Sequence, residues 1–203
     1  MASRKMREAQ KRFIEGEALT LFLEKSIVRT TIVNIARRVG IGEATVYRYF
    51  EKKDNIIIGS AKILANRVFE NYFSFTNLKS YDIVTGFYNN FLKIFNEHIE
   101  YYRFIDEFDR YAYEENYELN DYEELVSQFK DKFVFAYNEC YKNGQVKKIE
   151  NIDVFYIATT HALLDLCKRL SRDKGILPSD VTKDDKEVRM LIDIILNNIV
   201  KEK

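Results

Sequence analysis

The sequence predicts an all-α protein with a small N-terminal and a larger C-terminal domain, and three observations support this class. The chain of 203 residues contains one Pro and seven Gly, and 46% of its residues are hydrophobic. Apolar residues recur three and four positions apart along most of the chain, which is the spacing of one helix face. Alternating β-branched runs, which are typical of strands, do not occur. We expect a three-helix domain over residues 1–52 and an all-helical domain over residues 53–203.

The boundaries of the expected helices come from clusters of Gly, Pro, Asn and Asp that interrupt the apolar spacing. The first helix turns Ile14, Ala18, Leu21 and Phe22 inward. Helices are expected over residues 4–25, 31–39, 43–50, 53–72, 81–97, 99–115, 121–143, 153–174 and 183–201.

The second and third helices carry the most informative pattern of the chain. Thr31 is placed to cap the first of them with its hydroxyl, and Gly40 is placed to end it in the left-handed conformation. Ile41 follows as an apolar plug between the two helices. The short helix after the turn buries Val46 and Phe50 and leaves hydroxyls, aromatic rings and one Arg on its outer side. Two helices joined by a tight Gly-containing turn form a helix-turn-helix DNA reader. The alternative is a plain helical hairpin with a solvated polar face.

The residues at this turn resemble the DNA-binding signature of the TetR family of bacterial transcriptional repressors, and the likeness covers roughly residues 10 to 60. Ile14-x-x-x-Ala18-x-x-Leu21-Phe22 is similar to the first helix of that family. The resemblance implies an N-terminal DNA-binding unit and a helical C-terminal domain that dimerises and binds an effector. The pattern reads Thr31-x-x-x-Ile35-Ala36-x-x-x-Gly40-Ile41-Gly42-x-x-Thr45-Val46-Tyr47-Arg48-Tyr49-Phe50-x-x-Lys53-Asp54.

Three residues depart from the family pattern. Ser26 stands where a Gly commonly ends the first helix, so a differently built corner is expected there. Gly42 stands where a Ser often caps the recognition helix, which removes a side-chain cap but keeps the backbone turn. Glu43 would repel phosphate, so we expect it near a base edge, for example a cytosine amino group, or turned away from DNA.

The expected partner of this domain is a near-palindromic double-stranded DNA operator, read by two recognition helices ~34–36 Å apart. Arg48 is the best candidate for reading a base, at guanine, while Thr31 and Lys53 are expected to anchor phosphates at helix N-termini. The basic start of the first helix either reaches a neighbouring phosphate or minor groove or is a frayed, solvated terminus. The predicted DNA-binding residues are Thr31, Gly42, Glu43, Ala44, Thr45, Tyr47, Arg48, Tyr49 and Lys53.

The charge distribution agrees with this interpretation, although the formal net charge of the chain is zero. Residues 1–53 contain twelve Lys and Arg and six Asp and Glu, a net charge of +6. The remaining residues contain 20 basic and 26 acidic side chains, a net charge of −6. A basic head on an acidic body concentrates the attraction for phosphate at one end of the chain.

The C-terminal part contains more aromatic residues than a simple helical bundle needs. Such rings either pack into a solid core or leave a cavity for a flat apolar ligand that tyrosine hydroxyls orient. The family resemblance favours a cavity and therefore an unidentified small-molecule effector. The candidate ligand-binding residues are Phe91, Phe95, Tyr102, Phe108, Phe129, Phe133, Tyr137 and His161.

The last two helices carry apolar stripes near seven-residue spacing, and two such helices from each of two chains would form a four-helix bundle. The alternative is that the stripes dock onto the body of their own chain. We expect a homodimer, as the resemblance also implies. The predicted interface consists of Phe155, Ala158, Thr159, Ala162, Leu166, Leu191, Ile192, Ile195 and Ile199.

Other classes of function find little support in the sequence. No catalytic constellation, phosphate-binding loop or metal-ligand spacing occurs, so we expect no enzyme, cofactor or metal. Cys140 and Cys167 are expected to be core residues. No apolar run is long enough for a signal peptide or membrane span, which predicts a cytoplasmic protein.

The sequence thus predicts a homodimeric repressor that a small apolar or aromatic effector releases from its operator. Two rival interpretations remain. In the first, the body of a DNA-bound protein binds another protein instead of a small ligand. In the second, the chain is a small-molecule enzyme or carrier with a vestigial head.

Overall fold

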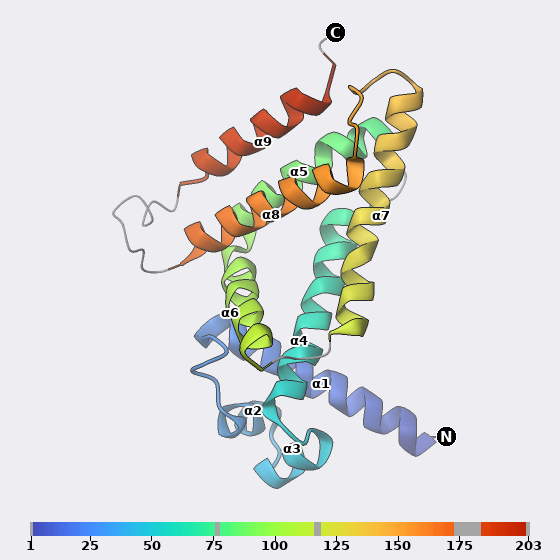
Figure 1. The fold of residues 1–203 in the computed structure, drawn as a ribbon. Helices are drawn as coiled ribbons and strands as arrows, with labels where there is room; N and C mark the ends of the chain where they lie inside the picture. Colours follow the sequence, from blue (N-terminus) through green and yellow to red (C-terminus); the bar gives the residue numbers. More distant parts are fainter. Residues whose placement is uncertain (1, 76–77, 116–118, 173–183, 202–203) are drawn as a thin grey trace. The chain divides into compact units, whose positions relative to one another are not determined.

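The chain folds entirely into helices and connecting segments in the part that the computed structural model describes, residues 2–75, 78–115, 119–172 and 184–201 (Figure 1). The all-α prediction is therefore confirmed. The predicted helix ends at residues 174 and 183 lie outside the described residues. The elements are α1 (Ala2–Lys25), α2 (Ile32–Val39), α3 (Glu43–Tyr49), α4 (Lys53–Val68), the π-helical turn η1 (Phe69–Phe73), α5 (Ser80–Glu97), α6 (Ile99–Glu115), α7 (Asn120–Lys142), α8 (Ile152–Ser171) and α9 (Lys186–Ile199).

The helices group into two compact units, and each unit contains two segments of the sequence. Unit 1 consists of Met1–Arg67 and Arg103–Leu125, and unit 2 of Val68–Tyr102 and Val126–Lys203. Unit 1 therefore combines α1 to α4 with most of α6. These compact units do not separate residues 1–52 from residues 53–203. The domain boundary between residues 52 and 53 therefore stays a prediction from the sequence.

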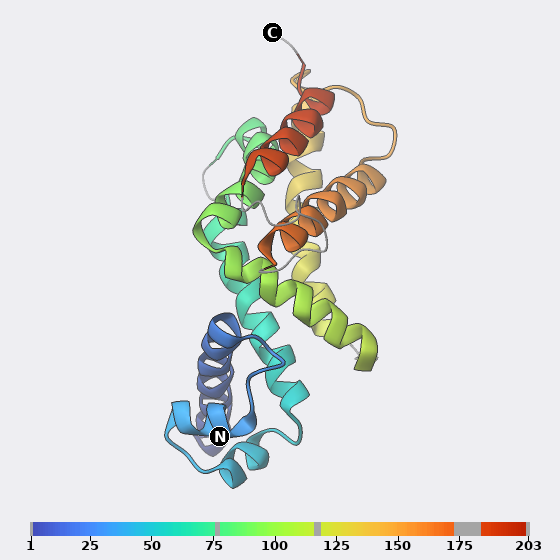
Figure 2. The same ribbon diagram turned by 90° about the vertical axis from the view of Figure 1, so that its left-hand side faces the viewer.

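In unit 1, α1 packs against α2 and α2 against α3, and Figure 2 shows α2 beside α1 with α3 following it. The Ser60 hydroxyl of α4 donates to the Glu15 carbonyl of α1 over 2.9 Å. The predicted inward residues of α1 are all buried: Ile14, Ala18, Leu21 and Phe22 are at most 4% exposed. The ring of Phe22 stacks on Phe104 of α6, with 6.2 Å between the ring centroids. Burying such rings and branched side chains is the main favourable contribution to the stability of this small unit.

The fourth helix, predicted over residues 53–72, is α-helical only as far as Val68 and ends in a π-helical turn. The α-helix stops at Val68, and η1 continues from Phe69 to Phe73. A π-helical turn adds a residue to the helical repeat and so rotates the side chains that follow it. Tyr72 and Phe73 of this turn are buried, at 9% and 3% exposure. Apolar spacing does not reveal this change of helix type.

In unit 2, α5, α8 and α9 pack against one another (Figure 1). The segment after α7 joins them through a single antiparallel bridge between Val146 and Val200. Next to that bridge, the backbone N–H of Lys147 donates to the carbonyl of Ile199 over 2.7 Å. These contacts fix the C-terminal end of α9 to the body of unit 2.

Candidate functional site

The start and end of α2 are built as the sequence predicts. The backbone N–H of Asn34 donates to Thr31 Oγ1 over 3.2 Å, and the N–H of Thr31 donates to Asn34 Oδ1 over 2.9 Å. This reciprocal pair is a capping box, which satisfies N–H groups that a helix start leaves free. Gly40 ends the helix with a φ of 71°, in the left-handed region that glycine tolerates best. Both predicted cap roles are confirmed.

The corner between α1 and α2 contains a non-glycine residue in a glycine conformation. Ser26 has a φ of 87°, and its N–H donates to the carbonyl of Phe22 over 2.9 Å. The buried Thr30 hydroxyl donates to the Ser26 carbonyl over 2.8 Å, and the Arg29 N–H donates to the Ser26 hydroxyl over 3.3 Å. The corner is thus left-handed, a conformation that Gly adopts most easily, and it contains a hydrogen bond to the Ser26 hydroxyl that a Gly could not accept.

Helix α3 is short and is attached to the domain by two residues. Val46 is fully buried and Phe50 is 3% exposed. No side chain caps the helix start: the N–H groups of Thr45 and Val46 instead donate to the carbonyl of Gly42 over 2.9 and 3.2 Å. The predicted loss of the side-chain cap with retention of the backbone turn is confirmed. Ile41, expected to be a buried plug, is half-buried.

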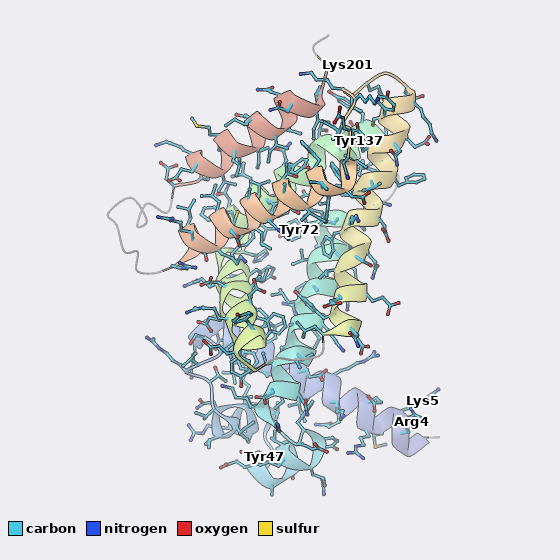
Figure 3. The ribbon with its side chains drawn as sticks, viewed as in Figure 1. Arg4, Lys5, Tyr47, Tyr72, Tyr137 and Lys201 are labelled. Atoms are coloured by element: carbon cyan, nitrogen blue, oxygen red, sulfur yellow. The ribbon has the colours of Figure 1, made fainter. Side chains whose placement is uncertain are left out.

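The outer side of α3 exposes side chains that were predicted from the sequence to contact DNA. Tyr47 is 51% exposed, and Figure 3 shows its place on α3. Arg48 is exposed, with its guanidinium carbon 5.9 Å from the centroid of the Tyr49 ring. Gly42, Glu43 and Ala44 are exposed, whereas Thr45 and Tyr49 are half-buried. A short exposed helix with two tyrosines, a hydroxyl and an Arg can enter a major groove and donate to base edges.

Lys53, the remaining predicted DNA contact, has a partner inside unit 1. Its ammonium donates to the carbonyl of Ile27 over 2.5 Å and lies 5.9 Å from the centroid of the Phe22 ring. Burial lowers the pKa of Lys53, and the carboxylates of Asp54 and Glu107 partly oppose this effect. Lys53 therefore holds the turn before α2 in this structure, and the predicted phosphate contact would have to compete with this hydrogen bond.

Helix α6 supplies further residues of this region that the sequence did not indicate. The backbone N–H of Ile27 donates to Glu107 Oε2 over 2.6 Å. The hydroxyl of Tyr111 donates to Asp54 Oδ1, at the start of α4, over 2.6 Å. These partners are separated by 80 and 57 positions in sequence, so no local pattern connects them. Together they attach α6 to the turn before α2 and to the start of α4.

The predicted ligand-binding residues do not form one group. Three of them, Phe91, Phe129 and Phe133, belong to an aromatic cluster of unit 2 with Phe73 and Phe87 at its centre. The ring centroids of Phe73 lie 5.0 Å from Phe129 and 5.9 Å from Phe91, and those of Phe87 and Phe133 lie 4.9 Å apart.

The same cluster includes Tyr88 and Tyr156, which the sequence pattern did not single out. The hydroxyls of Tyr88 and Thr159 are 2.9 Å apart and share a hydrogen bond. Burial raises the pKa of both tyrosines well above the usual value, so their hydroxyls stay protonated. They provide polar groups among the phenyl rings of unit 2.

The other predicted ligand-binding residues lie elsewhere. Phe95 and Tyr102 form a pair of rings with centroids 6.3 Å apart, and the Tyr102 hydroxyl donates to the backbone carbonyl of Phe91 over 2.9 Å. The Tyr137 hydroxyl is occupied by the backbone, since it donates to the Lys147 carbonyl and accepts from the Ile149 N–H. Two more are placed differently again. Phe108 packs in unit 1 between Phe104 and Tyr122, and His161 is exposed on α8.

The predicted dimer stripe on α9 needs a correction. Ile192, Ile195 and Ile199 are at most 5% exposed, so they belong to the core of their own unit. The spacing identified an apolar face correctly but did not reveal that this face turns inward. On α8, Ala158 and Ala162 are exposed, while Phe155, Thr159 and Leu166 are half-buried, as is Leu191 of α9.

The apolar residues that remain exposed on these two helices form what we call the α8–α9 face. Val154 is 59% exposed, Ile157 43%, Met190 66% and Ile194 53%. The α8 residues recur at intervals of three and four and thus lie on one side of the helix. The α8–α9 face comprises Val154, Ile157, Ala158, His161, Ala162, Met190 and Ile194.

Three further observations concern other classes of function. Within the residues that the structure describes, no group of three or more His, Cys, Asp and Glu is arranged to hold a metal ion. None of the described helices combines the length and the apolar character needed to cross a membrane. Cys140 and Cys167 are buried free thiols, which confirms that they are core residues.

Comparison with known families matches residues 16–58 to the family described as bacterial regulatory proteins, tetR family. This match covers α2, α3 and the parts of α1 and α4 that pack against them, so the family predicted from the motif is confirmed for the DNA-binding domain. Regulators of this family are DNA-binding transcription factors and not enzymes. No curated protein matches the chain in sequence.

Solved structures of transcriptional regulators share the fold along nearly the whole chain. The ketosteroid regulator KstR2 of Mycobacterium tuberculosis is 18% identical with a TM-score of 0.62, covering 95% of this chain and 96% of that one. The TetR family regulator PfmR of Thermus thermophilus is 17% identical with a TM-score of 0.64, covering 94% and 99%. A protein of Saccharomonospora viridis, described as a transcriptional regulator in complex with choline, is 15% identical with a TM-score of 0.70, covering 96% and 100%. The TM-scores show a likeness of fold, and identities of 15–18% show no more than that.

Proposed function

We propose that this chain, which carries the DNA-binding domain of a TetR-family transcriptional regulator, is a homodimeric repressor that a small apolar or aromatic effector releases from DNA. The observation that carries the proposal is the helix-turn-helix itself. Its first helix, α2, is capped, the inner side of α3 is buried, and the outer side of α3 is exposed. Tyr47, Arg48 and Thr45 supply donors and aromatic surface there, and Val46 and Phe50 fix their orientation.

The DNA contacts divide into base reading and phosphate positioning. Arg48 is assigned to a base, because a guanidinium can donate twice to guanine O6 and N7. Tyr47, Tyr49 and Thr45 complete the contact surface, together with the exposed backbone from Gly42 to Ala44. Thr31, at the exposed start of α2, is assigned to a phosphate. Lys53 is assigned to holding the turn at Ile27, where its ammonium already has an acceptor.

The homodimer is proposed to form through the α8–α9 face. This face presents four exposed aliphatic or Met side chains, beside the small residues Ala158 and Ala162, which allow helices to approach closely. A contact of this kind between two copies would bury apolar surface and bring two heads to one operator. The two-fold symmetry would place the recognition helices ~34–36 Å apart.

The effector is proposed to bind at the aromatic cluster of unit 2. Phenyl rings with the buried hydroxyls of Tyr88 and Tyr156 offer stacking surface and a few orienting polar groups. Choline, which accompanies the Saccharomonospora viridis protein, is a useful member of a test panel, because quaternary ammonium groups bind to aromatic faces. Aromatic acids, steroids and planar heterocycles form the rest of the panel.

The proposal is tested by binding of the purified protein to its own upstream DNA and to a pool of random duplexes, followed by sequencing of the bound fraction. We expect one near-palindromic sequence to be enriched. Tyr47→Ala and Arg48→Ala should each weaken specific binding by about 1–3 kcal/mol. Tyr113→Ala is the matched control, since Tyr113 is an exposed tyrosine of unit 1 outside α3. Enrichment of no sequence from either source would refute the proposal.

A further inference from the structure

The first three turns of α1 carry an unusual concentration of positive charge. They contain five basic residues and one acidic residue, Glu8. Within the described part of the chain, none of the five makes an ion pair, and α1 has no acidic residue in its first turn. The basic residues are Arg4, Lys5, Arg7, Lys11 and Arg12, of which Lys11 is half-buried and the others are exposed.

This arrangement is unfavourable for an isolated helix. The N-terminal end of a helix carries a partial positive charge, so cations there are repelled by the helix dipole. Arg7 also lies three positions from Arg4 and four from Lys11, and like charges at these spacings repel one another. An anionic partner would remove both penalties.

Two contacts place the basic turns of α1 beside the recognition helix. The guanidinium of Arg7 donates to the carbonyl of Arg48, near the C-terminal end of α3, over 3.3 Å. The ammonium of Lys11 lies 5.5 Å from the centroid of the Phe50 ring, directly after α3. The basic turns of α1 are therefore continuous with the surface that α3 presents.

The helical repeat determines where the preceding residues lie. Arg4, Arg7 and Lys11 are spaced i, i+3 and i+7, so they share one side of α1. Arg4 lies about 4.5 Å further along the helix axis than Arg7, beyond the point where α1 contacts α3. Figure 3 shows Arg4 and Lys5 at the N-terminal end of α1.

We propose that the first turns of α1 form a second DNA-contacting surface, which binds the phosphates that flank the bases read by α3. This inference rests on the proposed function, because it requires α3 to lie in a major groove. Arg4 and Lys5 reach the flanking backbone, while Arg7 and Lys11 keep α1 aligned with α3. Contacts of this kind add affinity and salt dependence but carry no sequence information.

The test uses the full-length double variant Arg4→Gln/Lys5→Gln, which leaves the α1–α3 contacts of Arg7 and Lys11 intact. Its affinity for the duplex that the wild type selects is measured by fluorescence anisotropy at several salt concentrations. We expect affinity at low salt to fall several-fold, and the slope of log K against log salt to decrease by about 0.9 for each phosphate that the variant no longer neutralises. The preferred sequence should not change.

Lys79→Gln/Lys148→Gln is the matched control, because it removes the same charge from two exposed residues of unit 2. A hydroxyl-radical footprint adds a second measurement: the variant should lose protection only at the outer edges of the site. A wild-type slope and footprint in the Arg4/Lys5 variant, with specific binding by the wild type, would overturn this inference alone. Failure of the wild type to select any duplex would overturn the proposed function and this inference together.

Discussion

Glu107 of α6 holds the backbone of Ile27, in the turn that leads into the helix-turn-helix. The N–H of Ile27 donates to Glu107 Oε2 over 2.6 Å, and the carbonyl of the same residue accepts from Lys53 over 2.5 Å. Both polar groups of one residue thus have charged partners, from α6 on one side and α4 on the other. Hydrogen bonds to charged groups are stronger than those between neutral groups.

Glu107→Ala should therefore destabilise unit 1. Removing the carboxylate leaves the N–H of the buried Ile27 without its acceptor, at an expected cost of about 1–3 kcal/mol. Urea unfolding followed by circular dichroism measures the change. Glu107→Gln keeps an acceptor at the same place and should lose less. Glu150→Ala removes an exposed glutamate of unit 2 and serves as the control. Equal stability of the Ala variant and the wild type would show that this hydrogen bond contributes nothing.

Lys53→Gln separates the role of the lysine in the fold from a role on DNA. Its ammonium donates to the Ile27 carbonyl, so the free energy of unfolding should fall by about 1–2 kcal/mol. The salt dependence of DNA binding should stay at the wild-type value, because no phosphate contact is removed. A slope that decreases by about 0.9 would instead establish Lys53 as a phosphate ligand. Lys52→Gln, at the exposed neighbouring lysine, controls for the stability measurement.

Ser26→Gly should stabilise the protein by up to about 1 kcal/mol. Ser26 has a φ of 87°, and a left-handed conformation costs a non-glycine residue about 1–2 kcal/mol. Removal of the bond from Arg29 N–H to the Ser26 hydroxyl offsets part of the gain. Ser26→Ala removes the same bond without gaining the freedom of glycine, so it should be less stable than the wild type. Thermal unfolding of the three proteins gives the order directly, and a Gly variant below the Ala variant would contradict the explanation.

Glu15→Gln should change the pH dependence of stability. The Glu15 side chain lies across Gly59, where a Cβ would collide with it, and burial raises its pKa above the usual 4.5. Because the folded pKa is raised, the stabilising contribution is complete below pH 4.5 and is lost as the pH rises through the folded pKa.

At pH 7 the half-buried carboxylate is therefore unfavourable, and the Gln variant should be more stable than the wild type, by an amount that screening by solvent keeps small. The advantage should disappear toward pH 4. Glu51→Gln removes the same charge at an exposed position of unit 1 and is the control. Chemical unfolding at a series of pH values provides the measurement, and parallel curves for the Glu15 variant and the wild type would refute this effect.

Ile194→Asp should convert the proposed dimer into a monomer. An unpaired carboxylate cannot enter an apolar interface without a large desolvation cost. Leu78→Asp is the control, since Leu78 is 52% exposed and Ile194 53%. Light scattering after size exclusion should give the mass of one 24.1 kDa chain for the Ile194 variant and twice that for the control. DNA affinity should fall with the dimer, and a dimeric Ile194 variant would place the interface elsewhere.

The helix-turn-helix was predictable because its signals are local in sequence. The cap at Thr31, the left-handed end at Gly40 and the buried Val46 each follow from residues within a few positions of one another. The hydrogen bond between Glu107 and Ile27 spans 80 positions and leaves no periodic trace. The prediction that the Ile192 side of α9 lies at the dimer interface was wrong for another reason. Ile192 and Ile194 are both aliphatic, and spacing alone does not tell which side of such a helix the rest of the chain covers.

Unit 1 is completed by residues 103–125, and this affects any attempt to engineer the protein. A fragment that ends at residue 67 lacks Glu107 and Tyr111 and uncovers the ring of Phe22 that Phe104 covers. The segment of residues 1–67 is therefore not expected to fold unchanged when it is moved into another protein without residues 103–125. A chimaeric regulator that joins these DNA-reading helices to a foreign sensor would need to bring α6 with them, or a foreign α6 redesigned to hold Ile27.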